Sequence, residues 1–259
     1  MKKILECEHL TKSFGKNGKK RLVAIDDVSF FLNEGEILAI VGESGSGKST
    51  IAKLITGLQK CDEGKVIIDG EDISALKGKK RREMYEKIQM VFQNPMDSFD
   101  PKKTLGYGIG ENLRNQKASR MEMNIRIGFQ LTKCGLPENF MDKYAYEVSG
   151  GQCQRAAIAR SLIVKPKILV CDEATSALDV TIQKQIIDLL KQLKTERNLS
   201  IIFICHNLAL LQQFCDRVLV LHKGKVIEQG TPDQIINTPQ TEYTKNLIDS
   251  IFTIEQEEE

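Results

Sequence analysis

The spacing GxxxxGK(S/T), typical of a phosphate-binding loop, occurs in Gly42-Glu43-Ser44-Gly45-Ser46-Gly47-Lys48-Ser49. Its glycines let successive backbone N–H groups turn toward one anion, because no side chain stands in the way. Lys48 can reach the β- and γ-phosphates of a nucleotide, and a hydroxyl such as that of Ser49 ligates Mg²⁺ in such loops. We therefore predict phosphate contacts from Gly42, Ser44, Gly45, Gly47, Lys48, Ser49 and Thr50.

Two adjacent carboxylates, Asp172 and Glu173, follow the apolar strand predicted at Lys167–Cys171. In a parallel sheet the carboxyl ends of the strands form the edge at which ligands bind. Asp172 suits the magnesium shell of a phosphate-binding protein. Glu173 suits the base that orients or deprotonates an attacking water. An ordinary helix cap is the structural alternative for this pair.

Strands that alternate with helices position these residues and predict a largely parallel sheet with helices on its faces. The strands are predicted at Glu36–Val41, Val66–Asp69, Ile88–Phe92, Lys167–Cys171, Ser200–Cys205, Arg217–His222 and Lys225–Gln229. Helices are predicted at Ser49–Leu58, Val180–Glu196, Asn207–Cys215 and from Thr231-Pro232 onward. Residues 94–164 have few strand-like runs, so we predict a helical subdomain there, inserted between core segments 1–93 and 165–254. Residues 255–259 are predicted to be a frayed acidic tail.

The chain has 259 residues, of which 41% are hydrophobic and 28% charged, with a net charge of +2. These values are ordinary for a globular protein and unlike those of a disordered one. The small net charge gives no reason to expect nucleic acid as a partner. The sequence shows no membrane-spanning run and no signal peptide, so we expect the chain in the cytoplasm. Its seven cysteines include no CxxC pair and are expected to be reduced thiols, mostly buried.

The segment Val148-Ser149-Gly150-Gly151-Gln152, followed by Gln154-Arg155, resembles the LSGGQ signature of ATP-binding-cassette proteins. The resemblance covers essentially the whole chain, since the motifs stand in that family's order. It implies an α/β fold with a P-loop NTPase core of the RecA-like type, an N-terminal antiparallel β portion and the inserted helical subdomain. It also implies that two subunits pack head to tail. The ATP of one subunit would then touch Ser149, Gly150, Gly151 and Gln152 of the other. A serine-capped helix is the plainer alternative.

Further site residues are implied by matching positions of the family. Phe14 matches the aromatic that stacks on adenine, with a core phenylalanine as the alternative. Gln93 matches the glutamine that touches Mg²⁺ or the attacking water, with a solvated loop residue as the alternative. His206 matches the switch histidine at the γ-phosphate, although a lone histidine often has a structural role. Asp179 is the last residue of the segment Ser176–Asp179, which resembles the family's subunit-contacting loop. A helix N-cap at Asp179 is the compatible alternative.

The branch of the family that fits best is the peptide and nickel importers. Residues 91–101 resemble the VFQxPxxSxxP stretch of that branch, and residues 238–247 resemble its HPYTxxL ending. The resemblance implies an ATPase that converts ATP and water to ADP and phosphate. Its catalytic residues would be Glu173, His206, Gln93 and Lys48, and its Mg²⁺ ligands Ser49, Gln93 and Asp172.

The resemblance implies integral membrane permease subunits and a second identical or related ATPase subunit as partners, and indirectly a solute-binding protein. These partners imply that the chain lies at the cytoplasmic face of the cell membrane. Three other functions stay open at this point. One is a cassette of an exporter, and another is a soluble cassette of translation or DNA repair. The third lies outside the family: a P-loop kinase that phosphorylates a small molecule. The sequence does not choose between peptide and nickel as cargo.

Overall fold

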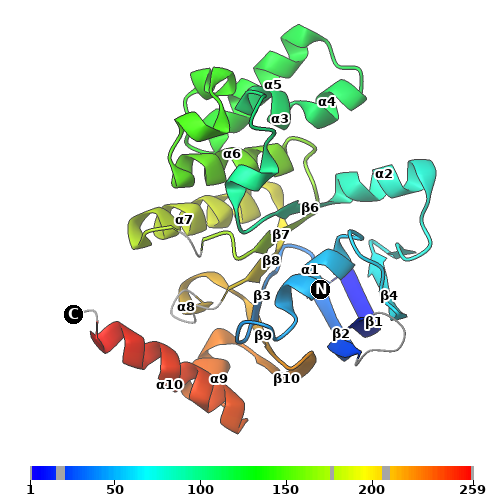
Figure 1. Cartoon of the computed structure of the whole chain (residues 1–259), viewed down its shortest axis with the longest axis vertical. Coiled ribbons are helices and arrows are strands. Elements are labelled where there is room, and N and C mark those ends of the chain that lie inside the picture. The colour runs from blue at the N-terminus through cyan, green and yellow to red at the C-terminus, as the bar shows by residue number, and fades with distance from the viewer. Residues whose placement is uncertain (1, 16–20, 176–177, 206–210, 258–259) are drawn as a thin grey trace.

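A six-stranded sheet forms the centre of the molecule (Figure 1). The structure is a computed structural model that describes residues 2–15, 21–175, 178–205 and 211–257. In spatial order the strands are β10 (Lys225–Gly230), β9 (Arg217–His222), β3 (Ile37–Val41), β8 (Ser200–Ile204), β7 (Ile168–Asp172) and β6 (Ile88–Val91). The five strands from β9 to β6 are parallel, and β10 pairs antiparallel with β9 in the predicted hairpin. The predicted α/β class with a parallel sheet is confirmed.

A second, four-stranded sheet is antiparallel and lies beside the first. Its order is β2 (Leu22–Asn33), β1 (Lys3–Phe14), β4 (Glu63–Ile68) and β5 (Glu71–Asp72). The strand predicted at Val66–Asp69 is β4, and the sheet to which it belongs confirms the N-terminal antiparallel β portion that the family resemblance implied. Its burial agrees with this place: Val66 and Ile68 are buried while their neighbours are not, as in a strand with one wet face.

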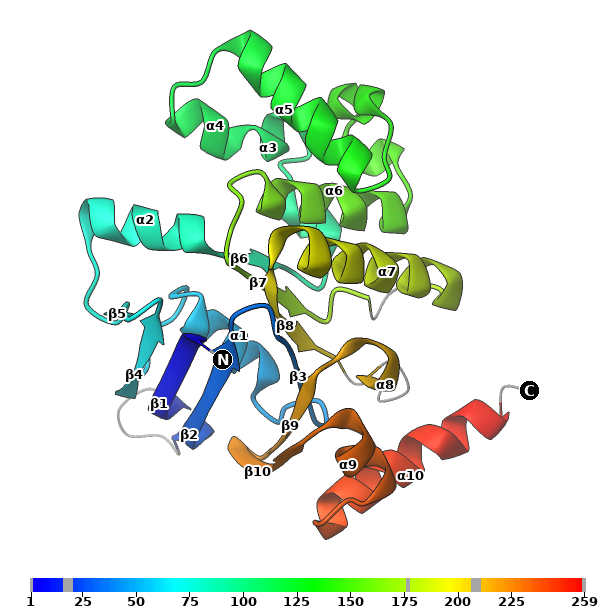
Figure 2. The same ribbon diagram turned by 180° about the vertical axis from the view of Figure 1, so that it is seen from behind.

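The central sheet is buried on both faces. Along β3 the side chains of Ile37, Ala39 and Val41 join one apolar cluster, whereas those of Leu38 and Ile40 join another. Helix α1 (Lys48–Ile55) packs within the second cluster, between the two sheets (Figure 2). Because both faces are covered, β3 is a continuous apolar run that holds the start of the phosphate-binding loop rigidly.

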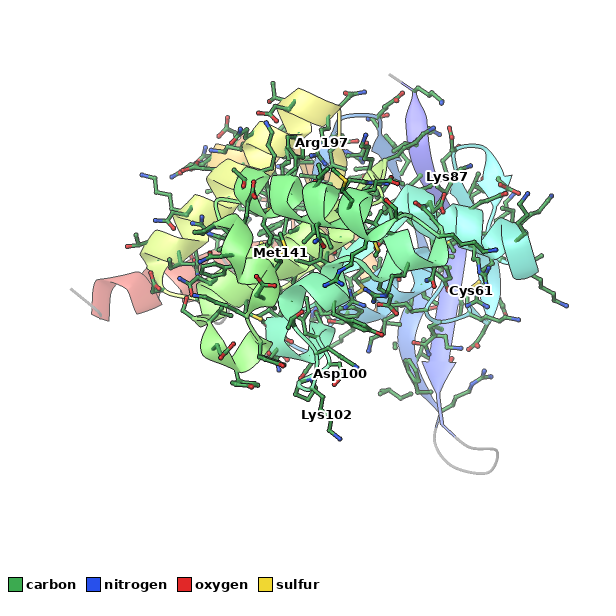
Figure 3. The ribbon with its side chains drawn as sticks, turned by 90° about the horizontal axis from the view of Figure 1, so that it is seen from above. Cys61, Lys87, Asp100, Lys102, Met141 and Arg197 are labelled. Atoms are coloured by element: carbon green, nitrogen blue, oxygen red, sulfur yellow. The ribbon has the colours of Figure 1, made fainter. Side chains whose placement is uncertain are left out.

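Helices cover the other face of the central sheet. In chain order they include α3 (Leu105–Ile109), α4 (Glu111–Asn115), α5 (Arg120–Lys133), α6 (Gly150–Leu162) and α7 (Val180–Arg197). The side chains of Thr104, Ser119 and Ser149 cap the first turns of α3, α5 and α6. Figure 3 shows these helices from above, with Asp100 and Lys102 at one edge and Lys87, which ends α2 (Gly78–Lys87), toward the antiparallel sheet. Short 3₁₀ turns at Pro95–Ser98, Glu138–Asp142 and Ala145–Glu147 link them.

Helix α8 (Leu211–Phe214) lies between β8 and β9 in the chain. Helices α9 (Pro232–Asn237) and α10 (Glu242–Glu257) follow the β9–β10 hairpin. Thr231 caps α9 and Pro232 occupies its first turn, as predicted. Helix α10 continues to Glu257, into the segment predicted as a frayed acidic tail from residue 255. Glutamate and glutamine are good helix formers and extend the helix. Within the described parts of the chain, no helix has both the length and the apolar character that a membrane span requires.

A buried ion pair joins the two sheets at the edge opposite the phosphate-binding loop. Arg217 Nε, at the start of β9, lies 2.7 Å from Glu36 Oε1 before β3, and both side chains are largely buried. The other carboxylate oxygen of Glu36 accepts from the backbone N–H of Asn33 at 2.6 Å. Arg217 also donates to the carbonyl of Phe31 in β2. The pair therefore fastens β2, β3 and β9 together.

Replacing Arg217 by Met should lower the free energy of unfolding by about 3 kcal/mol, because it leaves the Glu36 carboxylate buried without its cation. Urea denaturation of the isolated chain measures this. Lys225→Met is the matched control, since Lys225 pairs with Asp26 on an exposed part of the surface and its loss should change little. Equal losses in the two variants would contradict the role given to the buried pair.

Candidate nucleotide site

The phosphate-binding loop spans residues 42–47, between β3 and α1, and borders a cavity of about 390 Å³. Ser44, Gly45, Gly47, Lys48, Ser49 and Thr50 line this cavity. The loop therefore brings together the glycines, the lysine and the hydroxyls that the sequence predicted for one site. Gly42 lies at the base of the loop, against β9.

Two glycines of the loop stand where no other residue fits. Gly42 has φ +150°, and a Cβ there would lie 2.1 Å from the carbonyl oxygen of Leu221 in β9. Gly47 has φ +110° and precedes α1, where a Cβ would lie 2.5 Å from the carbonyl oxygen of Ala24. The loop thus packs directly on the backbone of two strands, β9 and β2. Within the loop, the Ser46 N–H donates to the carbonyl of Glu43 at 3.2 Å and forms a turn.

Lys48 is buried, with 5% of its surface exposed. Its Nζ donates to the carbonyls of Gly42 at 2.7 Å and Glu43 at 2.8 Å. Burial lowers the pKa of Lys48, and the nearby charges of Glu173 and Asp172 raise it in opposition. The loop therefore holds an ammonium group in place beside the cavity before any phosphate arrives.

Ser49 and Asp172 form the part of the site that suits a metal ion. The Ser49 hydroxyl donates to Asp172 Oδ1 at 3.1 Å, which joins the start of α1 to the end of β7. Burial raises the pKa of Asp172, while the hydrogen bond from Ser49 and the charge of Lys48 oppose this shift. Both side chains offer oxygen atoms as metal ligands. Mg²⁺ is usually held by one or two such protein oxygens together with substrate phosphates. The residues present therefore fit Mg²⁺.

Glu173 and Gln93 meet at the edge of the cavity, and both line it. Gln93 follows β6 and its Nε2 donates to Glu173 Oε2 at 2.7 Å. Glu173 has φ +48°, in the left-handed region, and its N–H donates to the carbonyl of Ile204 at 3.0 Å. Strands β6, β7 and β8 thus all end at this point, as the sequence predicted for the carboxyl edge of a parallel sheet.

An apolar platform closes the other end of the cavity. Phe14, the last residue of β1, lines it together with Leu22 and Ala24 of β2. Phe14 pairs with Leu22 across the two strands, and the two side chains are exposed at 40% and 68%. Sequence reasoning missed Leu22 and Ala24. The signal was weak, because their place depends on the pairing of β1 with β2 and not on any motif.

Asp62 holds the two strand ends that carry this platform. It accepts from the Lys12 ammonium at 2.7 Å and from the Ser13 N–H at 2.8 Å, both at the end of β1. It also accepts from Arg21 at 3.2 Å, directly before β2. Bonds to Lys12 and Ser13 hold the pKa of the Asp62 carboxyl below its ordinary value. The Asp62 carboxylate therefore holds in place the residues that directly precede Phe14 and Leu22.

The segment 149–152 lies elsewhere. Ser149 caps α6 by accepting from the Gln152 N–H at 3.3 Å, and the Gln152 side chain accepts from the Ser149 N–H at 3.0 Å. Gly151 touches Ile182 of α7 so closely that a Cβ there would lie 2.6 Å from its methyl group. Among the described residues lining the nucleotide cavity, none comes from this segment. One chain alone does not bring the two motifs together.

Asp179 caps α7 by accepting from the Ile182 N–H at 3.0 Å, so the structure shows the plain N-cap that the sequence left open. His206, Ser176 and Ala177 lie outside the described residues. Cys205, the residue before His206, directly follows β8 and lies close enough to Lys48 to raise its pKa. Tyr243 of α10 reaches the loop, with its hydroxyl 3.0 Å from the Glu43 N–H. No motif pointed to that contact.

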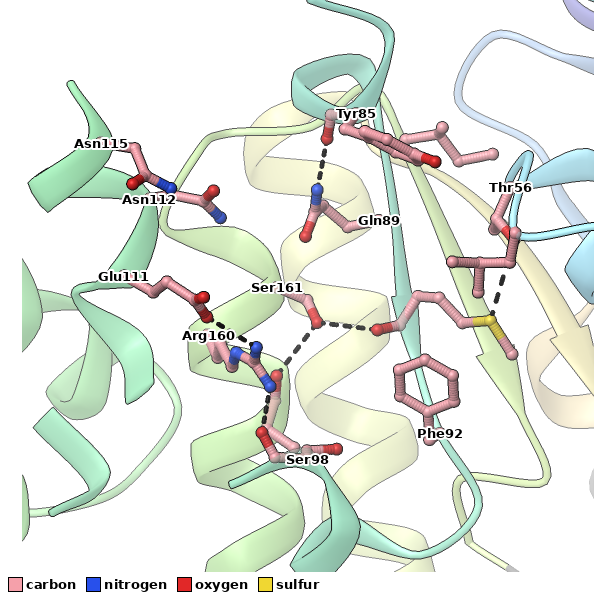
Figure 4. A pocket seen from close by; sticks show the side chains of 14 residues that line it. Thr56, Tyr85, Gln89, Phe92, Ser98, Glu111, Asn112, Asn115, Arg160 and Ser161 are labelled. Carbon is pink, nitrogen blue, oxygen red and sulfur yellow. Dashed lines mark hydrogen bonds and ion pairs between the residues drawn. The ribbon is translucent and has the colours of Figure 1, made fainter. Parts of the chain in front are cut away.

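A second cavity, of about 300 Å³, lies between β6 and the helices above it (Figure 4). Arg160 of α6 crosses it, pairing with Glu111 at 2.9 Å and donating to the carbonyl of Ser98. Phe92 and Leu58 expose apolar surface there. Phe92 directly precedes Gln93, so this groove and the nucleotide cavity lie on either side of the same short segment.

Comparisons with known proteins agree with this geometry. A family model described as ABC transporter matches residues 25–176. The oligopeptide transport ATP-binding protein OppF of Salmonella typhimurium is 45% identical, over 96% of this chain and 78% of its own length. OppF of Streptococcus pyogenes serotype M1 is 38% identical over 96% of this chain and 82% of its own. The chain belongs to the ABC transporter family.

Solved ABC structures share the fold. The ATP-binding cassette MJ0796, in a dimeric post-hydrolysis state bound to ADP and Pi, has a TM-score of 0.80 at 31% identity, covering 88% of this chain and 98% of its own. CbiO1 from Clostridium perfringens, part of the ABC transporter complex cbiONQ, has a TM-score of 0.80 at 29% identity, covering 92% of each chain. The family resemblance given by the sequence of this ABC chain is therefore confirmed.

Replacing Gly42 by Ala should abolish nucleotide binding, because its Cβ would meet the Leu221 carbonyl and force the loop away from β9. Gly45→Ala is the matched comparison. A Cβ there meets nothing within 4 Å, and only the left-handed φ of +81° opposes it, a strain of about 1 kcal/mol. Titration with a fluorescent ATP analogue should show a far smaller loss for Gly45→Ala. Similar losses in the two variants would contradict the steric argument.

Proposed function

We propose that this ABC chain is the ATP-hydrolysing subunit of a membrane importer of oligopeptides. The observation that carries the proposal is the meeting of Lys48, Ser49 and Glu173 around one cavity, with Asp172 hydrogen bonded to Ser49. A buried ammonium, a buried carboxylate suited to Mg²⁺ and a carboxylate placed as a base are the groups that phosphoryl transfer to water requires. Lys48 begins α1 after β3, and the two carboxylates stand at the end of β7 in the same parallel sheet, which makes their arrangement a property of the fold.

ATP binds with its base on Phe14 and Leu22 and its phosphates on the loop. Stacking on an aromatic ring stabilises a bound base by about 1–3 kcal/mol. Backbone N–H groups of the loop and of the first turn of α1, residues 48–50, contact the phosphates, because the N-terminus of a helix favours an anion. Lys48 lies beside the γ-phosphate. Ser49, Asp172 and Gln93 would hold Mg²⁺, which would supply positive charge to the phosphate oxygens.

Water attacks the γ-phosphate from the side of Glu173. The carboxylate of Glu173 accepts a proton from this water or orients it, and the amide of Gln93 fixes the carboxylate through their 2.7 Å hydrogen bond. His206, matched from the family, follows β8 and contacts the γ-phosphate. Lys48 balances the negative charge that develops as the bond between the γ-phosphorus and the oxygen of the leaving ADP breaks. The products are ADP and phosphate.

A second cassette completes the site. The N-terminus of α6 is exposed, with Ser149 and Gly150 open to solvent and outside the described lining of this chain's own nucleotide cavity. An exposed N-terminus of a 13-residue helix suits an anion. Two copies of this chain, or this chain and a related one, pack head to tail so that Ser149, Gly150, Gly151 and Gln152 of one contact the ATP of the other. Asp179 lies at the same contact. The dimeric form of MJ0796 supports this arrangement.

The groove in Figure 4 receives a cytoplasmic segment of the permease. Its lining supports this, because exposed Phe92 and Leu58 offer apolar contact and Arg160 and Glu111 already neutralise each other. The groove separates a nucleotide-binding core, residues 1–93 and 165–254, from a helical subdomain, residues 94–164. Movement of the subdomain reaches Gln93 through the segment that follows β6. The chain therefore works at the cytoplasmic face of the membrane.

Oligopeptides are the proposed cargo, since relatives that are 42–45% identical to this chain are named oligopeptide transport ATP-binding proteins. A solute-binding protein delivers the peptide to the permease and has no contact with this chain. Nickel or a metal chelate is the alternative cargo, because importers of that branch resemble this chain in the same motifs.

Replacing Glu173 by Gln should keep ATP binding and lower steady-state hydrolysis by about a hundredfold or more, because the amide cannot accept the proton. Gel filtration with ATP and Mg²⁺ should show a trapped dimer, whereas wild type returns to monomers after turnover. Glu63→Gln is the control, because it makes the same carboxylate-to-amide change at an exposed residue of β4. Hydrolysis at the wild-type rate in the Glu173 variant would remove that residue from the role of base.

The cargo is tested with the intact complex, purified through a tag on this chain and reconstituted in vesicles. ATP supplied on the side of this chain should drive uptake of a labelled oligopeptide, and the Glu173→Gln complex should drive none. Uptake of nickel without peptide would assign the other cargo. Outward transport would contradict the importer, and a tagged chain that recovers no membrane subunit would contradict the proposal as a whole.

A further inference from the structure

One peptide unit of the phosphate-binding loop, between Gly42 and Glu43, is hydrogen bonded on both of its sides. Its carbonyl oxygen, from Gly42, accepts from Lys48 Nζ at 2.7 Å. Its N–H, from Glu43, donates to the Tyr243 hydroxyl at 3.0 Å. A trans peptide is planar, so its carbonyl and its N–H point in opposite directions and turn together. Whatever fixes the N–H also fixes the carbonyl that holds Lys48.

Tyr243 can fix this N–H because its ring is itself held. The ring lies against that of His222, the last residue of β9, with 3.8 Å between centroids and 39° between planes. Burial raises the pKa of the Tyr243 hydroxyl, and the hydrogen bond from Glu43 opposes this. The hydroxyl therefore stays neutral near pH 7 and keeps a lone pair for the N–H.

The start of α10, which carries Tyr243, is fastened to the hairpin. The carboxylate of Glu228 in β10 accepts from the N–H of Gln240 at 2.8 Å and from the N–H and hydroxyl of Thr241 at 3.2 and 3.1 Å. The hydroxyl of Thr241 in turn accepts from the N–H of Thr244 at 3.1 Å, within the first turn of α10. This network makes the position of Tyr243 a consequence of the hairpin.

The same hairpin holds the loop directly. The N–H of Gly224, in the turn between β9 and β10, donates to the carbonyl of Ser46 at 2.9 Å. Gly42 packs on the carbonyl of Leu221, as described above. The loop is therefore fixed to β9 at two points by backbone contact, and Tyr243 supplies the side-chain contact between them.

We infer that Tyr243 is a positioning residue for ATP hydrolysis, which acts on Lys48 through the peptide between Gly42 and Glu43. Without its hydroxyl the Glu43 N–H loses its acceptor, the peptide can rotate, and the Gly42 carbonyl no longer holds the ammonium in line with the phosphates. The inference rests on the proposed function in one respect, since Lys48 is there the residue that contacts the γ-phosphate.

Tyr243→Phe removes the hydroxyl and leaves the ring on His222. It should lower kcat/KM for ATP by about threefold to tenfold, the effect of one neutral hydrogen bond, and leave the thermal midpoint unchanged. Tyr107→Phe is the matched control, since Tyr107 lies on α3 at the exposed top of the molecule. Wild-type kinetics in Tyr243→Phe would overturn the inference.

A double-mutant cycle separates positioning from a general structural effect. Affinity for trinitrophenyl-ATP is measured for wild type, Tyr243→Phe, Lys48→Ala and the double variant. If Tyr243 acts through Lys48, its removal should cost affinity in the presence of Lys48 and change it by less than about twofold in its absence. An equal loss in both backgrounds would overturn the inference.

Hydrogen exchange gives a readout that needs no nucleotide. The amide of Glu43 should exchange faster in Tyr243→Phe than in wild type, while peptides of the helical region should not change. Unchanged exchange in the loop would count against the inference, however the kinetics turn out. A wild-type chain that fails to hydrolyse ATP would overturn the proposed function, whereas a working wild type with an equally active Tyr243→Phe overturns only the role of Tyr243.

Discussion

A buried ammonium group held by two backbone carbonyls is the interaction on which this site depends. Removing a lysine from water is costly, and the carbonyls of Gly42 and Glu43 offset part of that cost by direct hydrogen bonds. The carboxylates of Asp172 and Glu173 offset more through their charge. Burial lowers the pKa of Lys48 and raises that of Asp172, and the charge of each group opposes the shift of the other. Each charged group is therefore more stable in the presence of the other. The phosphates of a nucleotide then enter a site whose cation is already fixed.

The parallel sheet makes that arrangement reproducible. Strands β3, β8, β7 and β6 are neighbours with one direction, so the loop, Cys205, the two carboxylates and Gln93 all lie at one edge. No hinge separates them. The groups outside this edge are held by other means: Phe14 by the antiparallel sheet and Asp62, and the segment 149–152 by the helices. In the proposed cycle, the second cassette and the helical region move around the phosphate site.

Local motifs predicted the phosphate loop, Asp172, Glu173 and Gln93, because each lies within a few residues of the strand that positions it. The sequence predicted the strand β4 but not its partner, since a short apolar run says nothing about which strand it pairs with. Leu22 was missed because its role depends on pairing with Phe14. Tyr243 lies 200 residues from Glu43 in sequence, and no short-range pattern records a contact of that kind. The roles of 149–152 depend on a second chain, which one sequence suggests only through its family.

The backbone at Glu173 links the base to the neighbouring strand. A glutamate at φ +48° is in the left-handed region, which costs a residue with a Cβ about 1 kcal/mol. The hydrogen bond from its N–H to the Ile204 carbonyl offsets this cost and can form only while β7 and β8 end in register. The turn directs the side chain to Gln93, away from the sheet. Because Gln93 directly follows Phe92, which lines the groove of Figure 4, the strained residue connects the proposed base to the surface proposed for the permease. Backbone strain at a functional residue persists only where the surrounding structure holds it, and here Gln93 after β6 and the Ile204 carbonyl of β8 do so.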